Sequence, residues 1–398
     1  MSVHVVIAAA GTGGHIYPGL AVAQELRALD PQAAVTFLTT RRGLGPVLLR
    51  RHGEAFHVVA GEPAPARLSP AAAVFAAALA RGAVEAAWRL RALGARVVLA
   101  TGGYGCAPAV AGARMVRIPV VWQEQNALPG RATRLMARWA RAVALGFEEA
   151  RNRLPAPVQA RAVVTGNPVR RELLTVGREE GIRRLGLEAG LRTVLVVGAS
   201  QGARRFNFAV VEAAEELAHL EGAQVLVSTG QSQFDEVEAA LSARYPGGRR
   251  DSGGWRLGRL RVVPYVDDMP AAVAAADLAV SRAGAISIAE YTARGVPLIL
   301  VPYPYAAEGH QQLNARAVER AGAGVVVPDG ALTGSRLVEV IRELLIEPRA
   351  LAGHGPGEPA ARPARGSRGG GEAGAAGGRS VTGRAAPGFF PRHTMKRS

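Results

Sequence analysis

Short runs of apolar residues alternate along the chain with stretches in which apolar positions recur every three or four residues. The first run, residues 3–9, ends in a glycine turn, and residues 16–29 then have helical spacing. Further runs at residues 35–39, 97–101 and 120–122 are apolar, as in strands covered by helices on both faces of a parallel sheet. The first half of the chain is therefore predicted to be an α/β domain.

The second half repeats this arrangement. The pattern breaks near residues 165–170, a charged helical stretch follows, and residues 193–197 form a new apolar run that leads into a glycine turn and a helix. From residue 353 onward Gly, Ala, Arg and Pro predominate without periodicity, which is typical of disorder. We predict two Rossmann-like domains that face each other across a cleft. The expected boundaries are residues 1–164 and 165–349, followed by a low-complexity tail over residues 350–398.

Residues 281–304 contain the clearest candidate site. The pattern predicts strand, glycine loop, helix and strand, with Gly295 ending the helix. A glycine loop that opens onto a helix presents free backbone N–H groups and the positive end of the helix dipole, which suits a phosphate. Glu290, inside this helix, is placed to accept hydrogen bonds from both hydroxyls of a ribose. The alternative is an ordinary strand-to-helix turn in which Glu290 is a solvated side chain.

A second glycine turn, residues 11–14, precedes His15. A neutral imidazole at this junction suits a general base near pH 7, and the alternative is a histidine that only packs against the turn. The turn matches a dinucleotide-binding fingerprint poorly, because the third glycine position is Ile16 and no acidic residue ends the next strand. NADP remains an alternative through Arg41 and Arg42, which follow that strand.

Polar side chains follow two other predicted strands. Residues 123–126 come directly after an apolar run, and Gln311, Gln312 and Asn314 follow the run at residues 298–301. Ligands bind at the carboxyl ends of the strands in open α/β sheets, so both loops are candidate substrate contacts. Their amide groups suit sugar hydroxyls, and the alternative for the second group is a polar helix cap.

Composition limits the remaining classes of protein. A hydrophobic content of 48% over 398 residues suits globular domains, and no apolar run is long enough to span a membrane. The single cysteine, Cys106, excludes an intrachain disulfide and fits a reducing cytoplasm. We expect no signal peptide, because a strand that ends in a glycine loop begins within two residues of Met1. We also expect no metal, since no Cys/His cluster has metal-ligand spacing, and no cofactor. The net charge of +16 favours an anionic partner, namely nucleic acid, an acidic membrane or a phosphorylated substrate.

Two arginine-rich stretches in the first half suit such a partner. Residues 71–93 combine large apolar side chains with arginines, as in a helix that lies on an anionic bilayer; the alternative is a helix that packs its apolar face on a sheet. The second stretch has arginines at spacings of three, four and three, which predicts one basic helix face with no acidic neighbour. These residues are Arg131, Arg134, Arg138 and Arg141.

Six motifs follow one another in order along residues 3–350. They are GTGGH at 11–15, EQN at 124–126, GNPVR at 166–170, SQGAR at 200–204, SRAGA at 281–285 and QQ at 311–312. Together they resemble the MurG family, bacterial enzymes that transfer N-acetylglucosamine (GlcNAc) from UDP-GlcNAc to a lipid-linked muramyl-pentapeptide. The resemblance implies the GT-B fold, with the membrane-borne acceptor on the first domain and the UDP-sugar on the second.

The resemblance also implies a set of site residues. Glu290 holds the ribose, backbone atoms of Val266 meet the uracil, and Ser200 meets the diphosphate together with the helix start at Ala285. Gln312 and Asn126 meet the sugar, and His15 is the candidate catalytic base. The implied UDP-GlcNAc site comprises Thr12, Gly13, Gly14, Asn126, Arg170, Ser200, Val266, Ala285, Ile286, Ser287, Glu290, Gln311 and Gln312. It requires neither a metal nor a cofactor.

The implied reaction is an inverting transfer of GlcNAc to the C4 hydroxyl of the muramyl sugar, which converts lipid I to lipid II in peptidoglycan synthesis. The enzyme is expected at the cytoplasmic face of the cell membrane as a peripheral protein, without nucleic acid as a partner. Two alternatives stay open: another GT-B enzyme of UDP-sugars, either an epimerase or a transferase with a soluble acceptor, and a non-enzymatic nucleic-acid-binding protein. The chain departs from the family at Gln123, where a histidine is common, and in its Gly/Arg-rich tail.

Overall fold

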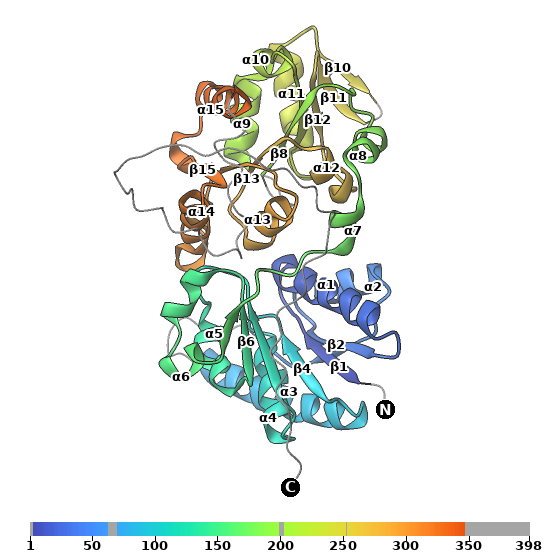
Figure 1. The fold of residues 1–398 in the computed structure, drawn as a ribbon, viewed down its shortest axis with the longest axis vertical. Helices are drawn as coiled ribbons and strands as arrows, with labels where there is room; N and C mark the ends of the chain where they lie inside the picture. The colour runs from blue at the N-terminus through green and yellow to red at the C-terminus, as the bar shows by residue number, and fades with distance from the viewer. Residues whose placement is uncertain (1–2, 63–69, 199–202, 252, 347–398) are drawn as a thin grey trace, which may run out of the picture. The chain divides into compact units, whose positions relative to one another are not determined.

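A computed structural model describes residues 3–62, 70–198, 203–251 and 253–346. These residues belong to one compact unit. Ser200 and the predicted low-complexity tail lie outside the described residues. The unit contains two sheets, each covered by helices on both faces (Figure 1), which confirms the predicted α/β class.

The first sheet has seven parallel strands in the order β3-β2-β1-β4-β5-β6-β7. Their bounds are β1 His4–Ala8, β2 Ala34–Thr40, β3 Phe56–Val59, β4 Val97–Ala100, β5 Val120–Glu124, β6 Ala142–Leu145 and β7 Ala162–Val164. The strand order reverses between β1 and β4, and ligands of open α/β sheets bind at the carboxyl ends of strands at such a point. The glycine turn before His15 follows β1, so the topology places it at the reversal.

Alternate side chains of these strands point to opposite faces and meet different helices. Val6 and Ala8 of β1 pack in one apolar cluster with α3 and α4, whereas Val5 and Ile7 pack with α1 and α2. Residues of this half form the helices α1 Gly13–Leu29, α2 Gly45–Arg51, α3 Pro70–Ala92, α4 Cys106–Met115, α5 Arg131–Met136 and α6 Ala156–Gln159, with 3-10 turns η1 Ala137–Trp139 and η2 Glu148–Arg153. Helix α3 therefore packs apolar side chains into the core, as in the alternative given for residues 71–93, a helix that packs its apolar face on a sheet.

The second sheet has eight strands in the order β10-β11-β12-β9-β8-β13-β14-β15. Their bounds are β8 Arg192–Val197, β9 Ala223–Ser228, β10 Arg249–Asp251, β11 Gly254–Leu257, β12 Leu260–Val263, β13 Leu278–Ser281, β14 Leu298–Leu300 and β15 Gly324–Val326. The strands from β12 to β15 in that order are parallel, while β10 and β11 add antiparallel strands at one edge. Here the order reverses between β8 and β13, so the turn before α13 lies at the switch point.

Helices again cover both faces of this sheet. The intervening stretch forms α7 Arg171–Thr175 and α8 Arg178–Leu185, and the remaining helices are α9 Arg204–Glu212, α10 Ala214–Ala218, α11 Phe234–Arg244, α12 Met269–Ala275, α13 Ala285–Thr292, α14 His310–Arg320 and α15 Gly334–Ile346, with 3-10 turns η3 Ala307–Gly309 and η4 Asp329–Ala331. Val194 and Val196 of β8 pack with α9, α11 and α15, whereas Leu195 packs with α12, α13 and α14.

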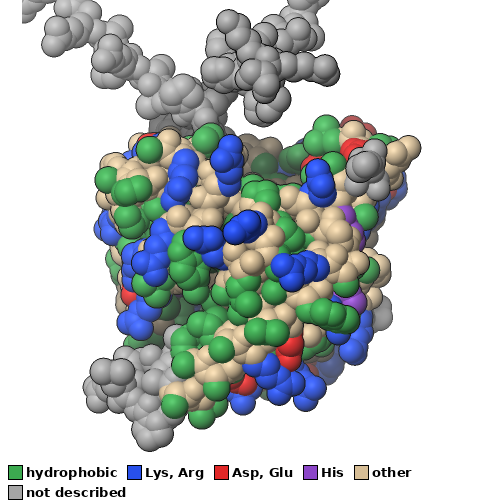
Figure 2. All heavy atoms as spheres, turned by 90° about the horizontal axis from the view of Figure 1, so that it is seen from below, with side chains coloured by type: hydrophobic (Ala, Val, Ile, Leu, Met, Phe, Trp, Pro, Cys, Tyr) green, Lys and Arg blue, Asp and Glu red, His purple; other side chains and the backbone are tan. Residues whose placement is uncertain are grey.

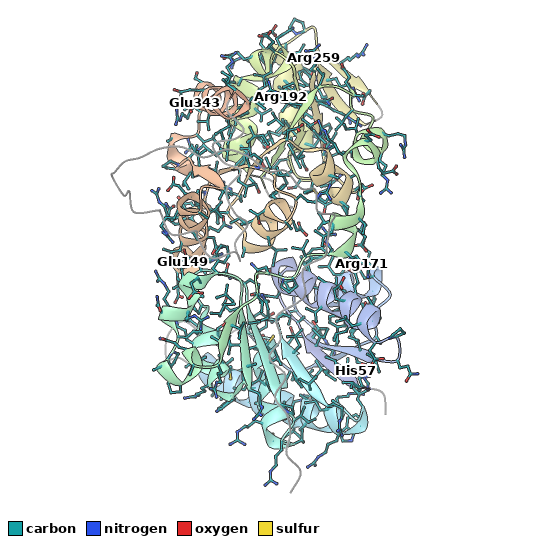
Figure 3. The ribbon with its side chains drawn as sticks, viewed as in Figure 1. His57, Glu149, Arg171, Arg192, Arg259 and Glu343 are labelled. Atoms are coloured by element: carbon teal, nitrogen blue, oxygen red, sulfur yellow. The ribbon has the colours of Figure 1, made fainter. Side chains whose placement is uncertain are left out.

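Several hydrogen bonds and ion pairs join the two halves. Asn314 of α14 accepts a hydrogen bond at Oδ1 from the Ala127 backbone N–H at 2.8 Å. Arg320 of the same helix pairs with Glu149 of η2 at 2.5 Å, and Figure 3 shows Glu149 beside α14. The polar loops that follow strands of both sheets are therefore brought together, which the sequence pattern by itself does not establish.

Candidate active site

The His15 imidazole lies against the turn that follows β4. Its Nδ1 is 3.2 Å from the Thr101 carbonyl oxygen, and a carbonyl only accepts hydrogen bonds, so Nδ1 bears the hydrogen. Gly103 has φ of +79°, and a Cβ at this position would lie 2.9 Å from His15 Cδ2 and from the Ala10 carbonyl oxygen. Only glycine fits there, because any side chain would collide with the ring or the backbone. The remaining nitrogen, Nε2, has the free lone pair.

The surroundings of His15 keep its ring neutral. Burial lowers the pKa of His15 and outweighs the opposing effects of the Glu124 carboxylate, the Thr101 carbonyl and the Gln125 side chain. His310, at the start of α14, adds a smaller repulsion that also lowers this pKa, so the second sheet supplies part of the environment. A neutral imidazole with its Nε2 lone pair available is the form that a general base requires at pH 7.

Glu124 organises the loop that follows β5. Its side chain is 3% exposed and accepts hydrogen bonds from the backbone N–H groups of Asn126 at 2.9 Å and Gly130 at 3.1 Å, and from the Thr133 hydroxyl. A buried carboxylate that accepts four hydrogen bonds, the fourth from Asn126 Nδ2 at 3.3 Å, is well satisfied and holds the loop in one conformation. Glu124 therefore acts on His15 through its charge and on Asn126 through direct contact.

On the second sheet, Glu290 points from α13 towards Arg170. The residue is only 9% exposed, and its Oε1 accepts a hydrogen bond from Arg170 Nη2 at 3.0 Å. Burial raises the pKa of Glu290, and the Arg170 charge opposes this shift. The Arg170 guanidinium also lies 4.9 Å from the centre of the Tyr17 ring, which belongs to α1 of the first half. Arg170 thus links the two halves next to the predicted ribose position.

The remaining predicted residues fall into three groups. Ala285, Ile286 and Ser287 form the first turn of α13, where backbone N–H groups are free for an anion, and Thr12, Gly13 and Gly14 lie at the start of α1. Gln311 accepts a hydrogen bond from the Tyr303 N–H at 2.9 Å, while Gln312 is exposed. Asn126 accepts a hydrogen bond at Oδ1 from Asn314 Nδ2 at 3.1 Å.

Val266 lies in the loop after β12, with its side chain buried. It lines a cavity of about 520 Å³, together with residues of the β10–β11 hairpin and the end of α8. Among the described residues predicted to bind UDP-GlcNAc, only Val266 is in the wall of this cavity, so the cavity is separate from the Glu290 pair. The backbone of the Val266 loop, which the uracil prediction requires, borders this cavity.

Comparison with known proteins assigns both halves to one enzyme family. Residues 5–145 match the glycosyltransferase family 28 N-terminal domain, and residues 193–358 match the family 28 C-terminal domain. The UDP-N-acetylglucosamine–N-acetylmuramyl-(pentapeptide) pyrophosphoryl-undecaprenol N-acetylglucosamine transferase of Halothermothrix orenii is 38% identical over 349 residues, which cover 87% of this chain and 91% of that protein. The enzyme of the same name from Symbiobacterium thermophilum is 38% identical over 348 residues, covering 87% and 88%.

Comparison with solved structures leads to the same family. MurG of Acinetobacter baumannii aligns with a TM-score of 0.65 and 27% identity, over 88% of this chain and 92% of that one. The chain belongs to the MurG family. This MurG-family glycosyltransferase has the GT-B fold predicted from its motifs. A putative UDP-N-acetylglucosamine 2-epimerase from Listeria monocytogenes shares the fold with a TM-score of 0.61 at 13% identity, over 89% of this chain and 92% of that one.

One prediction about this MurG-family chain is wrong. Helix α5 ends at Met136, so Arg138 and Arg141 do not continue the helix face of Arg131 and Arg134. Both Arg131 and Arg134 donate to Glu308 of η3, at 3.2 and 2.9 Å. Helical spacing detects only neighbours along the chain, and Glu308 lies 177 positions after Arg131. These two arginines therefore contact the second half of the protein and have an acidic partner.

Sequence reasoning missed three residues that shape the site. Tyr17 stacks under Arg170, Thr101 holds His15 at its carbonyl oxygen, and Asn167 bridges loops of the two halves. Asn167 had a visible signal, because it belongs to the GNPVR motif between the halves. Tyr17 and Thr101 had none, since an aromatic side chain in a helix and a threonine after a strand are common in any α/β domain.

Proposed function

We propose that this chain transfers GlcNAc from UDP-GlcNAc to undecaprenyl-pyrophosphoryl-MurNAc-pentapeptide, lipid I, to form lipid II. Membership of a family whose relatives bear that activity in their names supports the proposal. The observation that carries the mechanism is the placement of His15, whose Nδ1 faces the Thr101 carbonyl oxygen at 3.2 Å, which leaves the Nε2 lone pair available. The acceptor and donor are therefore assigned to opposite sides of the same site.

The reaction is a single displacement with inversion at the anomeric carbon. The acceptor C4 hydroxyl attacks C1 of GlcNAc while its proton passes to His15 Nε2, and the bond from C1 to the UDP oxygen breaks. The departing diphosphate is stabilised by the free N–H groups at the start of α13 and by Arg170. Ser200, of the SQGAR motif, is the further diphosphate contact proposed from the sequence.

Donor recognition is assigned to the second domain, residues 165–349, and the acceptor to the first, residues 1–164. Glu290 accepts hydrogen bonds from the ribose hydroxyls, and backbone atoms of Val266 hold the uracil. Ala285, Ile286 and Ser287 contact the diphosphate. The remaining residues of the proposed UDP-GlcNAc site, some of them on the first domain, are Thr12, Gly13, Gly14, Asn126, Gln311 and Gln312.

A direct assay tests the whole reaction. Purified protein is mixed with radiolabelled UDP-GlcNAc and a lipid I analogue, without added metal, and the products are separated by chromatography. Label in a β-linked disaccharide on the lipid is the expected result, because single displacement inverts the α-linkage of the donor. Release of a C2-epimerised sugar, or transfer only to soluble acceptors, would contradict the proposal in favour of the other GT-B activities.

The first domain is proposed to bind the anionic cytoplasmic face of the membrane. Figure 2 shows arginine and hydrophobic side chains together on one face of this half. The Trp88 side chain is 61% exposed beneath the Arg89 guanidinium, 4.8 Å away, and Trp139 is 39% exposed with Arg138 at 5.2 Å. Rings with adjacent guanidinium groups suit the boundary between acyl chains and phosphates. Among the helices that the structure describes, none is long and apolar enough to cross a membrane.

Charge reversal at the two arginines beside these rings is predicted to weaken binding to vesicles. The double variant Arg89→Glu/Arg138→Glu should lower the partition coefficient on phosphatidylglycerol vesicles at least about tenfold, since each basic residue near such a surface contributes about 1 kcal/mol. Vesicle co-sedimentation provides the measurement. The matched control, Arg244→Glu/Arg336→Glu, changes the same charge on helices of the second half. An equal loss in both variants would mean that net charge alone attracts the protein.

A further inference from the structure

A continuous chain of hydrogen bonds runs from the His15 ring towards the donor-side helix. It begins at the Thr101 carbonyl, which His15 Nδ1 contacts at 3.2 Å. Gln125 Nε2 donates to the same carbonyl and, with its second hydrogen, to Gln123 Oε1 at 2.5 Å. The Gln123 and Gln125 side chains are 2% and 3% exposed. The catalytic histidine therefore shares its backbone acceptor with a buried amide.

The chain continues across the junction between the two halves. Gln123 Nε2 donates to Asn167 Oδ1 at 2.9 Å. Asn167 Nδ2 donates to the Gln125 carbonyl at 3.0 Å and to the Ala285 carbonyl at 3.3 Å. Ala285 is the first residue of α13, the helix whose N-terminus is assigned to the donor diphosphate. Three side-chain amides thus connect His15 with the start of α13.

The direction of each bond is determined by its neighbours. The Thr101 and Ala285 carbonyls can only accept, so the amide nitrogens of Gln125 and Asn167 must face them. Gln123 then has one arrangement left, with its oxygen towards Gln125 and its nitrogen towards Asn167. Buried amides with satisfied partners resist rotation, because any flip leaves a donor facing a donor.

Two glycines leave room for this network. A Cβ on Gly102 would lie 3.3 Å from both Gln125 Oε1 and His15 Nδ1. A Cβ on Gly146, after β6, would lie 2.6 Å from Asn167 Cγ. The backbone at both positions therefore approaches the amides closely. At Gly146 a Cβ would overlap the Asn167 amide, and at Gly102, where φ is +88°, a side chain would be strained and tightly packed.

We propose that Gln125, Gln123 and Asn167 are positioning residues that hold His15 with its hydrogen on Nδ1 and its basic lone pair on Nε2. They also connect His15 to α13 by hydrogen bonds. Holding the donor-side helix in place therefore also holds the orientation of the His15 ring on the acceptor side. The catalytic part of this inference rests on the proposed role of His15. The tautomer and orientation of the ring do not depend on that role.

Imidazole ¹⁵N spectra of the full chain, labelled at histidine, test the relay without an activity assay. The His15 signal is assigned by its loss in His15→Gln. Wild-type protein is expected to show a single Nδ1–H tautomer for His15 at pH 7.5, and Gln123→Leu a mixture of tautomers. In the same variant kcat should fall about tenfold, as for a misplaced catalytic group, with KM for UDP-GlcNAc nearly unchanged.

Further variants separate positioning from general damage. Gln123→Glu keeps the side-chain volume and the acceptor for Gln125 but loses the donor to Asn167, so it should reproduce the tautomer mixture if Gln123→Leu does not fold. Asn167→Ala combined with Gln123→Leu should be no worse than the more severe single variant, because both break the same chain. Gln159→Leu is the matched control, since its amide donates at 2.7 Å to the Leu154 carbonyl in another part of the first half.

The outcomes distinguish this inference from the proposed function. An unchanged His15 tautomer and pH–rate profile in Gln123→Leu, Gln123→Glu and Asn167→Ala would overturn the relay, even if those variants lost activity through instability. A changed tautomer together with full activity of His15→Gln would instead overturn the catalytic role of His15. The expected combination, a tautomer mixture with lower kcat and an unchanged Gln159→Leu control, supports both.

Discussion

His15→Gln is expected to lower kcat for GlcNAc transfer by about 10²–10⁴-fold, the usual contribution of a positioned general base. Glutamine has a similar reach and retains an amide donor for the Thr101 carbonyl, so the packing against Gly103 is largely preserved. It has no basic nitrogen, so the acceptor hydroxyl must attack while still protonated. Calorimetric affinity for UDP-GlcNAc should be nearly unchanged, because the His15 side chain is not among the proposed donor contacts.

The pH dependence of kcat/KM in the wild-type enzyme provides a second test of His15 as the general base. A base works only when deprotonated, so kcat/KM should rise with pH through the pKa of His15. Burial holds that pKa below the ordinary value of about 6.5, so the rise should be largely complete by pH 7. His15→Gln should lose this acidic limb. His57→Gln is the matched control, because His57 lies on strand β3 away from the junction of the two halves (Figure 3). Wild-type turnover by the His15→Gln variant would exclude His15 as the base.

Glu290→Gln is expected to weaken UDP-GlcNAc binding about 10- to 100-fold. Hydrogen bonds to a charged group contribute about 1.5–3 kcal/mol, and the amide removes the charge while keeping the shape. The amide oxygen remains available to Arg170, which lies 3.0 Å from Glu290 in the wild-type protein, so the buried cation keeps a partner. Calorimetric titration without added metal measures the affinity directly.

A second Arg–Glu pair provides the control for this variant. Arg27 Nη2 contacts Glu54 at 2.6 Å near the end of α1, in a pair that involves none of the proposed donor contacts. Glu54→Gln should leave the affinity unchanged, while thermal melting reports whether either variant is destabilised. Equal affinities for wild type and a folded Glu290→Gln would place the ribose elsewhere, and the donor assignment of α13 would fail.

Elements with strong local patterns were predictable from the sequence. The apolar run before Gly11 and the helical spacing after it correspond to β1 and α1, and residues 281–304 form the predicted strand, loop, helix and strand. The β10–β11 hairpin was not predicted. The three residues of β10, Arg249, Arg250 and Asp251, are exposed and polar, so the strand has no hydrophobic signal and depends on pairing with its neighbour.

The sequence by itself determined the fold class, the family and the identity of most candidate residues, because strand and helix periods and the ordered motifs are local properties of the chain. Only the tertiary structure decided how these residues are used. Arg134 of α5 pairs with Glu308 of η3, and Gln123 of β5 donates to Asn167, which in turn donates to the Ala285 carbonyl at the start of α13. Such pairs lie far apart along the chain, and their geometry follows from sheet order and packing, which no local pattern specifies.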